Sequence, residues 1–473
     1  MLHIEAGVRF FNPMGGRLCL SALCGVIQRG LTMSCEHLHT FSRIWKHPEK
    51  NQDELAAFRN RKLRSVLKNA YDNVRYYRDL FDTAGIKPED IRTVNDLGLI
   101  PMTSSQDYRI RPLQEALSRK ARPHRMVKRA TSGSTGRPFI IRRSPLEDHL
   151  LNMFRIRAFR QFGVRVSDKM AQIRLVSASH HRENILGNIR QKVGIYRDYP
   201  LDCLQSISTI IRELRDLKPN VIKGYPAVIS HIAPFISAEG KKDIRPRFLI
   251  TGGESLVPFR RQLIESGFGK RVYDIYGSHE FNMLAWECPV TGEYHICDDN
   301  VIVEILRNGH PAEIGERGEV VVTGLHSYLM PFIRYRLGDV VTKGHDVCQC
   351  GQPFSTLKAI QGRMHDYFRM PDGSPMHPDE IVVPIMENES DWFDRYQLVQ
   401  ESENLIVLKV KPFSTPQEEQ LQHVRNLAEE RLPAGVEFRI DLVRALSSKG
   451  SGKFRFCKSK IHSDCENIDW NHL

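Results

Sequence analysis

The sequence predicts an α/β protein with a large N-terminal domain of mostly parallel β-sheets flanked by helices, followed by a small mobile α+β C-terminal domain. Four apolar segments, 169–176, 220–225, 246–253 and 271–277, lead into turns and alternate with helical patterns. Strands that alternate with helices are typical of βαβ units and a largely parallel sheet. Beyond residue 368 the pattern changes to that of a small unit with its own strands and helix. Together these two observations give the fold class.

The other elements follow from patterns in chain order. Residues 52–82 carry apolar side chains at helical spacing with charges between them, which predicts an amphipathic helix or a helical pair. A further helical pattern covers 145–162, and strand patterns with turns cover 315–325 and 334–341. The C-terminal unit is expected to contain strands within 395–411, a helix near 416–431 and a strand over 436–443.

These patterns divide the chain into three regions. We expect an N-terminal extension over 1–50, a large domain for ATP and carboxylate binding over 51–362, and a small lid domain over 363–473. The last of these is about the minimum size for a separate domain.

Composition limits the classes of function. With 473 residues and 41% hydrophobic content, the chain can bury a large core. A net charge of +12 favours an anionic partner, which could be a nucleotide, a nucleic acid or a membrane surface. The sequence has neither a zinc-finger spacing nor an aromatic RNA-binding strand pattern. We therefore expect no nucleic-acid partner.

The N-terminal region and the cysteines bear on location. The apolar run at 18–27 is too short to span a bilayer and lacks a small-residue cleavage site. Ten scattered cysteines suit a reducing compartment better than a disulfide framework. We expect a cytoplasmic protein with no transmembrane segment, and peripheral membrane contact and a homodimer are left open.

The stretch RATSGSTGRPFI at 129–140 is rich in glycine and hydroxyl side chains. Glycine lets a ligand approach the backbone, and hydroxyl and amide groups donate hydrogen bonds, so this loop suits phosphate oxygens. It is not a Walker loop, because no Lys-Ser/Thr pair follows the glycines. A plain Ser/Gly-rich connector is the alternative. The candidate ligands are Thr131, Ser132, Gly133, Ser134, Thr135, Gly136 and Arg137.

Five segments in the right order resemble motifs of the AMP-forming ligase superfamily, which includes acyl- and aryl-CoA ligases, peptide-synthetase adenylation domains and luciferases. They are TSGSTGRP, YGSHE, YRLGD, GRMHD and GSGKFR. The resemblance covers roughly 55–457. Within the superfamily the chain is most similar to phenylacetate-CoA ligases and their capsule-biosynthesis relatives.

The resemblance implies roles for individual residues. Glu280 would hold Mg²⁺, Asp339 would accept hydrogen bonds from ribose hydroxyls, and Lys453 would bridge the carboxylate and the α-phosphate. His279 stands where the family usually has threonine, and its imidazole can donate in place of the hydroxyl. His365 stands at the hinge, where many members have an acidic residue or lysine. The other residues implied to contact ATP or AMP are Gly253, Glu254, Tyr276, Gly277, Ser278 and Arg363.

A second constellation consists of Cys288, His295, Cys348 and Cys350. Three thiolates and one imidazole complete a tetrahedral Zn²⁺ shell, and phenylacetate-CoA ligase-like proteins resemble this set. Four protein ligands leave no open position, so the zinc would be structural. Reduced loop cysteines are the alternative, because Cys-x-Cys is tighter than the usual two-residue knuckle.

These observations predict an AMP-forming ligase that uses ATP and Mg²⁺ to activate a carboxylic acid, with an aryl acid favoured, and passes the acyl group to coenzyme A. By resemblance, Tyr225, Gly252 and Gly253 would line the carboxylate pocket. One alternative is transfer to an amine or hydroxyl, or nucleotidyl transfer, in surface polysaccharide or secondary-metabolite biosynthesis. Another is a zinc-stabilised module that binds nucleotide without turnover. Glu280, Asp339 and Lys453 argue against that module.

Overall fold

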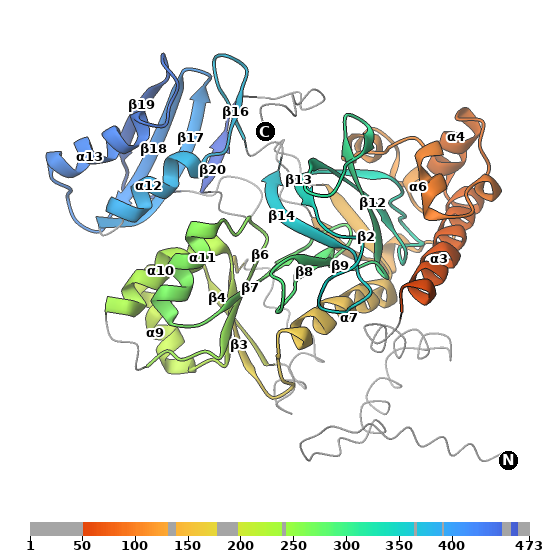
Figure 1. Cartoon of the computed structure of the whole chain (residues 1–473), viewed down its shortest axis with the longest axis horizontal. Helices are drawn as coiled ribbons and strands as arrows, with labels where there is room; N and C mark the ends of the chain where they lie inside the picture. Colours follow the sequence, from red (N-terminus) through yellow and green to blue (C-terminus); the bar gives the residue numbers. More distant parts are fainter. Residues whose placement is uncertain are drawn as a thin grey trace. The chain divides into compact units, whose positions relative to one another are not determined.

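The structure of the chain is a computed structural model that describes residues 51–130, 139–176, 197–238, 243–363, 367–389, 392–446 and 456–461. The chain from His47 onward forms one compact unit, and every feature below belongs to it. A twelve-stranded sheet flanked by helices dominates this unit, and a separate four-stranded sheet follows it in the chain (Figure 1). The predicted α/β class is confirmed.

Two helices begin the described chain, α3 (Gln52–Asn73) and α4 (Arg75–Thr83). The Asn51 side chain accepts a hydrogen bond from the Glu54 amide at 2.9 Å, which caps α3. Val74, with extended backbone, separates the two helices, so the helical pair predicted over 52–82 is confirmed. In the part of the chain that the structure describes, no helix combines the length and apolarity needed to span a membrane.

Short helical segments and a hairpin lead to the first long helix against the sheet. The short segments are η2 (Pro88–Asp90), η3 (Val94–Leu99), α5 (Ser105–Arg109), α6 (Leu113–Ala116) and η4 (Pro123–Arg125). Strands β1 (Val127–Ala130) and β2 (Ile140–Arg143) pair antiparallel and bracket the glycine-rich segment. Helix α7 (Pro145–Gln161) follows, with a capping box at Ser144, and matches the helix predicted over 145–162.

One end of the large sheet is parallel, in the order β7-β6-β5-β3-β4. Its strands are β3 (Lys169–Arg174), β4 (Arg197–Asp202), β5 (Val221–Gly224), β6 (Phe248–Gly252) and β7 (Val272–Tyr276). Helices α9 (Ile207–Leu217), α10 (Pro226–Ala238) and α11 (Pro258–Phe268) lie on one side of them (Figure 1). Ala171, Ile222 and Leu249 pack against these helices. The four strand segments predicted from the sequence are all present.

The rest of the large sheet is antiparallel, so the prediction of a mostly parallel sheet was wrong beyond β7. Its strands are β8 (Ala285–Glu287), β9 (Tyr294–Ile296), β10 (Val301–Arg307), β11 (His310–Pro311), β12 (Arg317–Gly324), β13 (Tyr335–Lys343) and β14 (Thr356–Arg363). They pair in the order β11-β10-β12-β13-β14-β9-β8, with β8 antiparallel to β7. The physical reason is that the connections here contain no helix, and parallel pairing needs a long crossover.

A four-stranded sheet and two helices form the C-terminal part, after a short hairpin of β15 (Phe368–Arg369) and β16 (Pro375–Met376). The sheet has the order β19-β18-β17-β20, with β17 (Phe393–Ser402), β18 (Leu405–Pro412), β19 (Glu437–Leu442) and β20 (Cys457–Ser459). Helices α12 (Asp379–Glu389) and α13 (Glu418–Glu429) share its hydrophobic core. Of these elements, the β15–β16 hairpin, α12 and β20 were not predicted from the sequence.

Candidate active site

Three loops meet where adjacent parallel strands end. Tyr225 follows β5, Gly253 and Glu254 follow β6, and Gly277 follows β7. Because β5, β6 and β7 are neighbours, these loops share one edge of the sheet, which is where ligands bind in open α/β sheets. The structure therefore brings together the predicted carboxylate-pocket residues and the YGSHE segment.

Glycines let the backbones pass closely in these loops. A Cβ on Gly277 would lie 2.1 Å from the carbonyl oxygen of Asn282, so no side chain fits there. Gly253 has a φ of +84°, a left-handed conformation that favours glycine. On Gly252 a Cβ would lie 2.6 Å from the Ile275 side chain. The Glu254 carboxylate accepts a hydrogen bond from the Ala227 amide at 3.4 Å, which ties its loop to the start of α10.

The loop after β7 presents a buried carboxylate. Glu280 is 6% exposed, and the Tyr335 hydroxyl donates to its Oε1 at 3.3 Å. Ser278 shapes the turn, because its Oγ accepts from the Phe281 amide at 3.2 Å. Glu280 is the predicted cation ligand, and its carboxylate oxygens are of the ligand type that a hard cation prefers.

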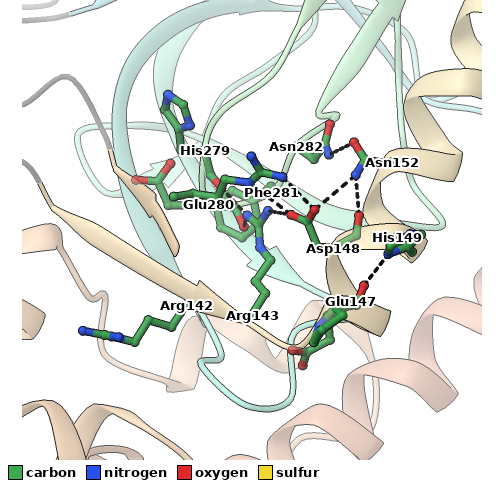
Figure 2. Close-up of polar contacts among 12 residues, drawn as sticks. Arg142, Arg143, Glu147, Asp148, His149, Asn152, His279, Glu280, Phe281 and Asn282 are labelled. Carbon is green, nitrogen blue, oxygen red and sulfur yellow. Dashed lines mark hydrogen bonds and ion pairs between the residues drawn. The ribbon is translucent and has the colours of Figure 1, made fainter. Parts of the chain in front are cut away.

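Arg143, at the end of β2, holds this loop from below (Figure 2). Its Nη2 donates to the carbonyl oxygen of Glu280 at 2.6 Å and to that of His279. Arg143 is 3% exposed, and burial lowers the pKa of its guanidinium. Asp148 of α7 lies 3.6 Å from Arg143 and also pairs with Arg129 at 2.7 Å. The ring of His279 projects away from Arg143 (Figure 2).

Asp339 joins the antiparallel strands to the same edge. It is buried, and the Tyr276 hydroxyl donates to its Oδ2 at 2.6 Å. Asp339 pairs across the sheet with Arg363, the last residue of β14. The structure thus places Tyr276, Asp339 and the Arg363 backbone together. Their role in ribose binding, in which a carboxylate would accept from hydroxyls, stays a prediction.

Several predicted residues lie outside the described ranges. These are the glycine-rich loop residues Thr131 to Arg137, the hinge residue His365 and the lysine Lys453, and for Arg363 only the backbone is described. Their roles remain predictions.

The predicted Cys/His set forms a compact cluster. The Sγ atoms of Cys288 and Cys348 lie 3.8 Å apart, and Cys350 Sγ lies 3.3 Å from Nε2 of His295. All four ligand atoms fall within 4.8 Å of one another. Burial lowers the pKa of His295 to about 4, which keeps its imidazole neutral and able to bind a metal. Three sulfurs and one neutral imidazole fit a tetrahedral Zn²⁺ ion.

The comparisons with known proteins agree with the resemblance seen in the motifs. No protein-family model matches the chain. Phenylacetate-coenzyme A ligase of Pseudomonas putida is 28% identical over 348 residues, which cover 71% of this chain and 76% of that protein. Protein CapK of Staphylococcus aureus is 22% identical and covers 89% of this chain and 93% of its own length. Indoleacetate--lysine synthetase of Pseudomonas savastanoi is 28% identical but covers only 41% of this chain and 47% of its own length.

A solved structure shows the same fold. 2-Hydroxyisobutyryl-CoA ligase in a postadenylation state has a TM-score of 0.69 at 19% identity and covers 88% of this chain and 91% of that chain. The chain is a homologue of the AMP-forming ligases. The resemblance seen in the five motifs is thereby confirmed, and the relatives support an AMP-forming acid–coenzyme A ligase.

A buried polar network around Asp274 was not predicted from the sequence. Asp274 of β7 accepts from the Thr251 hydroxyl at 2.6 Å and from the Tyr294 hydroxyl at 3.0 Å. Its amide donates to Glu287 at 2.9 Å, and Glu287 pairs with Arg261 at 2.8 Å. Thr251 precedes the glycines of the β6 loop, whereas Tyr294 and Glu287 each adjoin a residue of the Cys/His cluster. A charged residue within the apolar segment RVYDIYG was the available signal.

Replacing Arg143 tests the support of the Glu280 loop. Arg143→Met should lower the free energy of unfolding by about 2 kcal/mol or more, because two carbonyl groups lose a charged donor. Arg142→Met is the matched control. The Arg142 side chain points away from that of Arg143 (Figure 2), and its buried Nε lacks a hydrogen-bond partner among the described residues. Urea denaturation measures both. Equal losses in the two variants would show that Arg143 does not hold the loop.

Asp274 should make stability depend on pH. Burial raises its pKa from 3.8 to about 7, so the folded protein holds this proton more tightly than the unfolded chain. Its stabilising effect is present at acidic pH and is lost as the pH rises from about 4 to about 7. The free energy of unfolding of the wild type minus that of Asp274→Asn should fall over this range. Glu287 is present in both proteins, so a difference that does not change with pH would contradict the assignment.

Proposed function

We propose that the chain joins a carboxylic acid to coenzyme A in two steps. The acid first attacks the α-phosphorus of ATP, and a carboxylate oxygen forms the new P–O bond while the bond to the bridging oxygen breaks and pyrophosphate leaves. The thiol of coenzyme A then displaces AMP from the acyl-adenylate. One observation carries this proposal. Glu280, Tyr276 and Asp339 are buried together around one edge of the sheet. They lie beside β2, the strand that follows the glycine-rich segment.

The residues divide the work of the first step. A carboxylate and a triphosphate are both anions, so positive charge and oriented donors must offset their repulsion. Arg137 and the hydroxyl groups of the glycine-rich segment are proposed to hold the departing pyrophosphate. Asp339 and Tyr276 hold the ribose. Glu280 is the proposed Mg²⁺ ligand, and that ion supplies neutralisation of phosphate charge when bound.

Lys453 is proposed to reach the reacting groups from the small C-terminal domain. In this structure that domain contacts the large one through a buried ion pair, Arg260 with Asp379 at 2.9 Å. His231 Nε2 also lies 2.9 Å from the Asp394 carbonyl oxygen. Rotation about the GRMHD segment would have to exchange these contacts for others. The domain division at residue 363 is part of this proposal.

An aryl acid is the favoured substrate within the proposal, because Tyr225 and Tyr276 offer aromatic surface near the loop glycines. The second candidate keeps the acyl-adenylate but passes the acyl group to an amine or hydroxyl, or transfers the nucleotide itself. The relatives named CapK and indoleacetate--lysine synthetase favour keeping this candidate open. Consumption of coenzyme A distinguishes the two.

The Cys/His cluster is proposed to hold a structural Zn²⁺. The Thr291 amide donates to Cys288 Sγ at 3.5 Å, and its hydroxyl lies 3.6 Å from Cys348 Sγ, so polar groups surround the sulfurs. Since all four positions would be filled by protein, the ion has no place for a substrate. Its role would be to fix the β8–β9 turn and the Cys348 loop against each other.

Exchange of labelled pyrophosphate into ATP tests the first step. Across a panel of carboxylic acids, we expect exchange that needs both ATP and the acid. Glu280→Gln should lower the rate by about 100-fold or more, because a cation ligand at the reacting phosphates is lost. Glu313→Gln, at an exposed position, is the control. Acid-independent exchange, or equal rates in Glu280→Gln and wild type, would contradict the proposal.

Zinc content tests the cluster. Protein prepared without chelators should hold about one zinc per chain, and Cys348→Ser should lower both zinc content and melting temperature. Cys457, which lies outside the cluster on β20, supplies the control variant Cys457→Ser. Metal analysis that finds no zinc in wild-type protein would end this part of the proposal.

A further inference from the structure

A group of cations lies beside the proposed acid pocket and has no assigned role. Lys223 is on β5, two residues before Tyr225, and Arg174 ends β3. Arg155 is on α7. All three side chains are partly buried. Their electrostatic neighbours are each other, Arg129 and two carboxylates, Asp198 and Asp148. Both carboxylates already have partners, since Gln172 donates to Asp198 at 3.1 Å and Arg129 pairs with Asp148 at 2.7 Å.

The sheet register puts Lys223 and Arg174 on one face. Side chains alternate along a strand, and Ile222 and Ile173 pack into the core beneath α9, α10 and α11. Lys223 and Arg174 therefore point to the opposite face. Lys223 pairs across the sheet with Gln172, two residues before Arg174.

Helix α7 covers that opposite face. Phe162, at the end of α7, stacks on Tyr273 with ring centroids 4.7 Å apart, and the Lys223 ammonium lies 5.4 Å from the Phe159 ring centroid. Arg155 is one helical turn before Phe159, so it extends from the same side of the helix. These contacts place Arg155 over the sheet. It lies on the side of Phe159 that is nearer to the carboxyl ends of the parallel strands.

Arg155 also reaches the loop that carries Glu280. Its Nη2 donates to the Asn152 side-chain oxygen at 2.7 Å. Asn282 donates to the same oxygen at 3.1 Å (Figure 2). The group of cations is thus linked through Asn152 to the loop after β7.

Positive charge exceeds negative charge in this group. Among the residues that the structure describes, none of the three cations forms an ion pair with a carboxylate; Arg174 donates only to the Leu175 carbonyl, at 3.4 Å. Burial and the nearby Arg155 lower the pKa of Lys223 to about 8. Partly buried cations that outnumber the carboxylates around them are costly, and an anionic ligand would offset that cost.

We propose that Lys223, Arg155 and Arg174 bind a second anionic group of the acid substrate, so that this ligase activates an acid with two negative groups, such as a dicarboxylate or a phosphono acid. The inference rests on the proposed adenylation and deepens it. One carboxylate reacts at the α-phosphorus, while the other anionic group is held under α7. An aromatic ring between the two groups is compatible with this arrangement.

Matched acids test the inference by pyrophosphate exchange. The pairs are butyrate with succinate and phenylacetate with 3-carboxyphenylacetate, and 3-phosphonopropionate separates phosphonate from carboxylate recognition. Wild type should exchange faster, at limiting acid, with the dianionic member of a pair. Lys223→Met and Arg155→Gln should each lower the ratio of dianionic to monoanionic rates by about 10- to 100-fold, since each removes a charged contact. Lys270→Met, at an exposed position, should leave the ratio unchanged.

The outcomes separate this inference from the proposed function. Exchange that favours the monoanionic acids, or an unchanged ratio in both Lys223→Met and Arg155→Gln, overturns the second anion site while adenylation stands. A raised KM for coenzyme A with an unchanged ratio also overturns it, because the cations would then bind the acceptor's phosphates. Absence of exchange with every acid overturns the proposed function and this inference with it. Having two variants keeps the test valid if one fails to fold.

Discussion

The site depends on the contacts of one buried group, the guanidinium of Arg143. Three parts of the chain meet at this group: β2, which follows the glycine-rich segment, the start of α7, and the loop after β7 (Figure 2). In a position closed to water, two loop carbonyls need a strong donor, and a buried cation needs acceptors and a counter-ion. Arg143, the two carbonyls and Asp148 satisfy one another. The backbone of Glu280 is therefore held by Arg143, a residue more than a hundred positions away in the sequence.

Strand β7 divides the large sheet into two parts with different tasks. It is parallel to β6 on one side and antiparallel to β8 on the other. The parallel part supplies the loops at the strand ends, where Tyr225 and Gly253 lie. The antiparallel part supplies Asp339, which the Tyr276 hydroxyl ties to the end of β7, and also the Cys/His cluster. Asp274, in the middle of β7, contacts residues of both parts.

The sequence predicts features that rest on local chemistry. Glycines after apolar strands indicate the loops at Gly253 and Gly277, and the ligand types at Cys288, His295, Cys348 and Cys350 indicate a cluster before any contact is known. Long-range partners are harder to predict. The antiparallel pairing of β9 with β14 joins segments far apart in the chain. Arg143 looks like an ordinary strand residue until its partners are known, and the charge of Asp274 in an apolar segment does not show which groups it contacts. Helix α12 was missed because Pro384 interrupts its pattern.

The central claim is that the acid's own carboxylate attacks the α-phosphorus of ATP. A substrate acid labelled with oxygen-18 in its carboxylate tests this directly, because the attacking oxygen stays on phosphorus when AMP leaves. After turnover with coenzyme A, mass spectrometry should find one labelled oxygen in AMP and none in pyrophosphate. Label in inorganic phosphate, with ADP as the nucleotide product, would show an acyl-phosphate route and contradict the account.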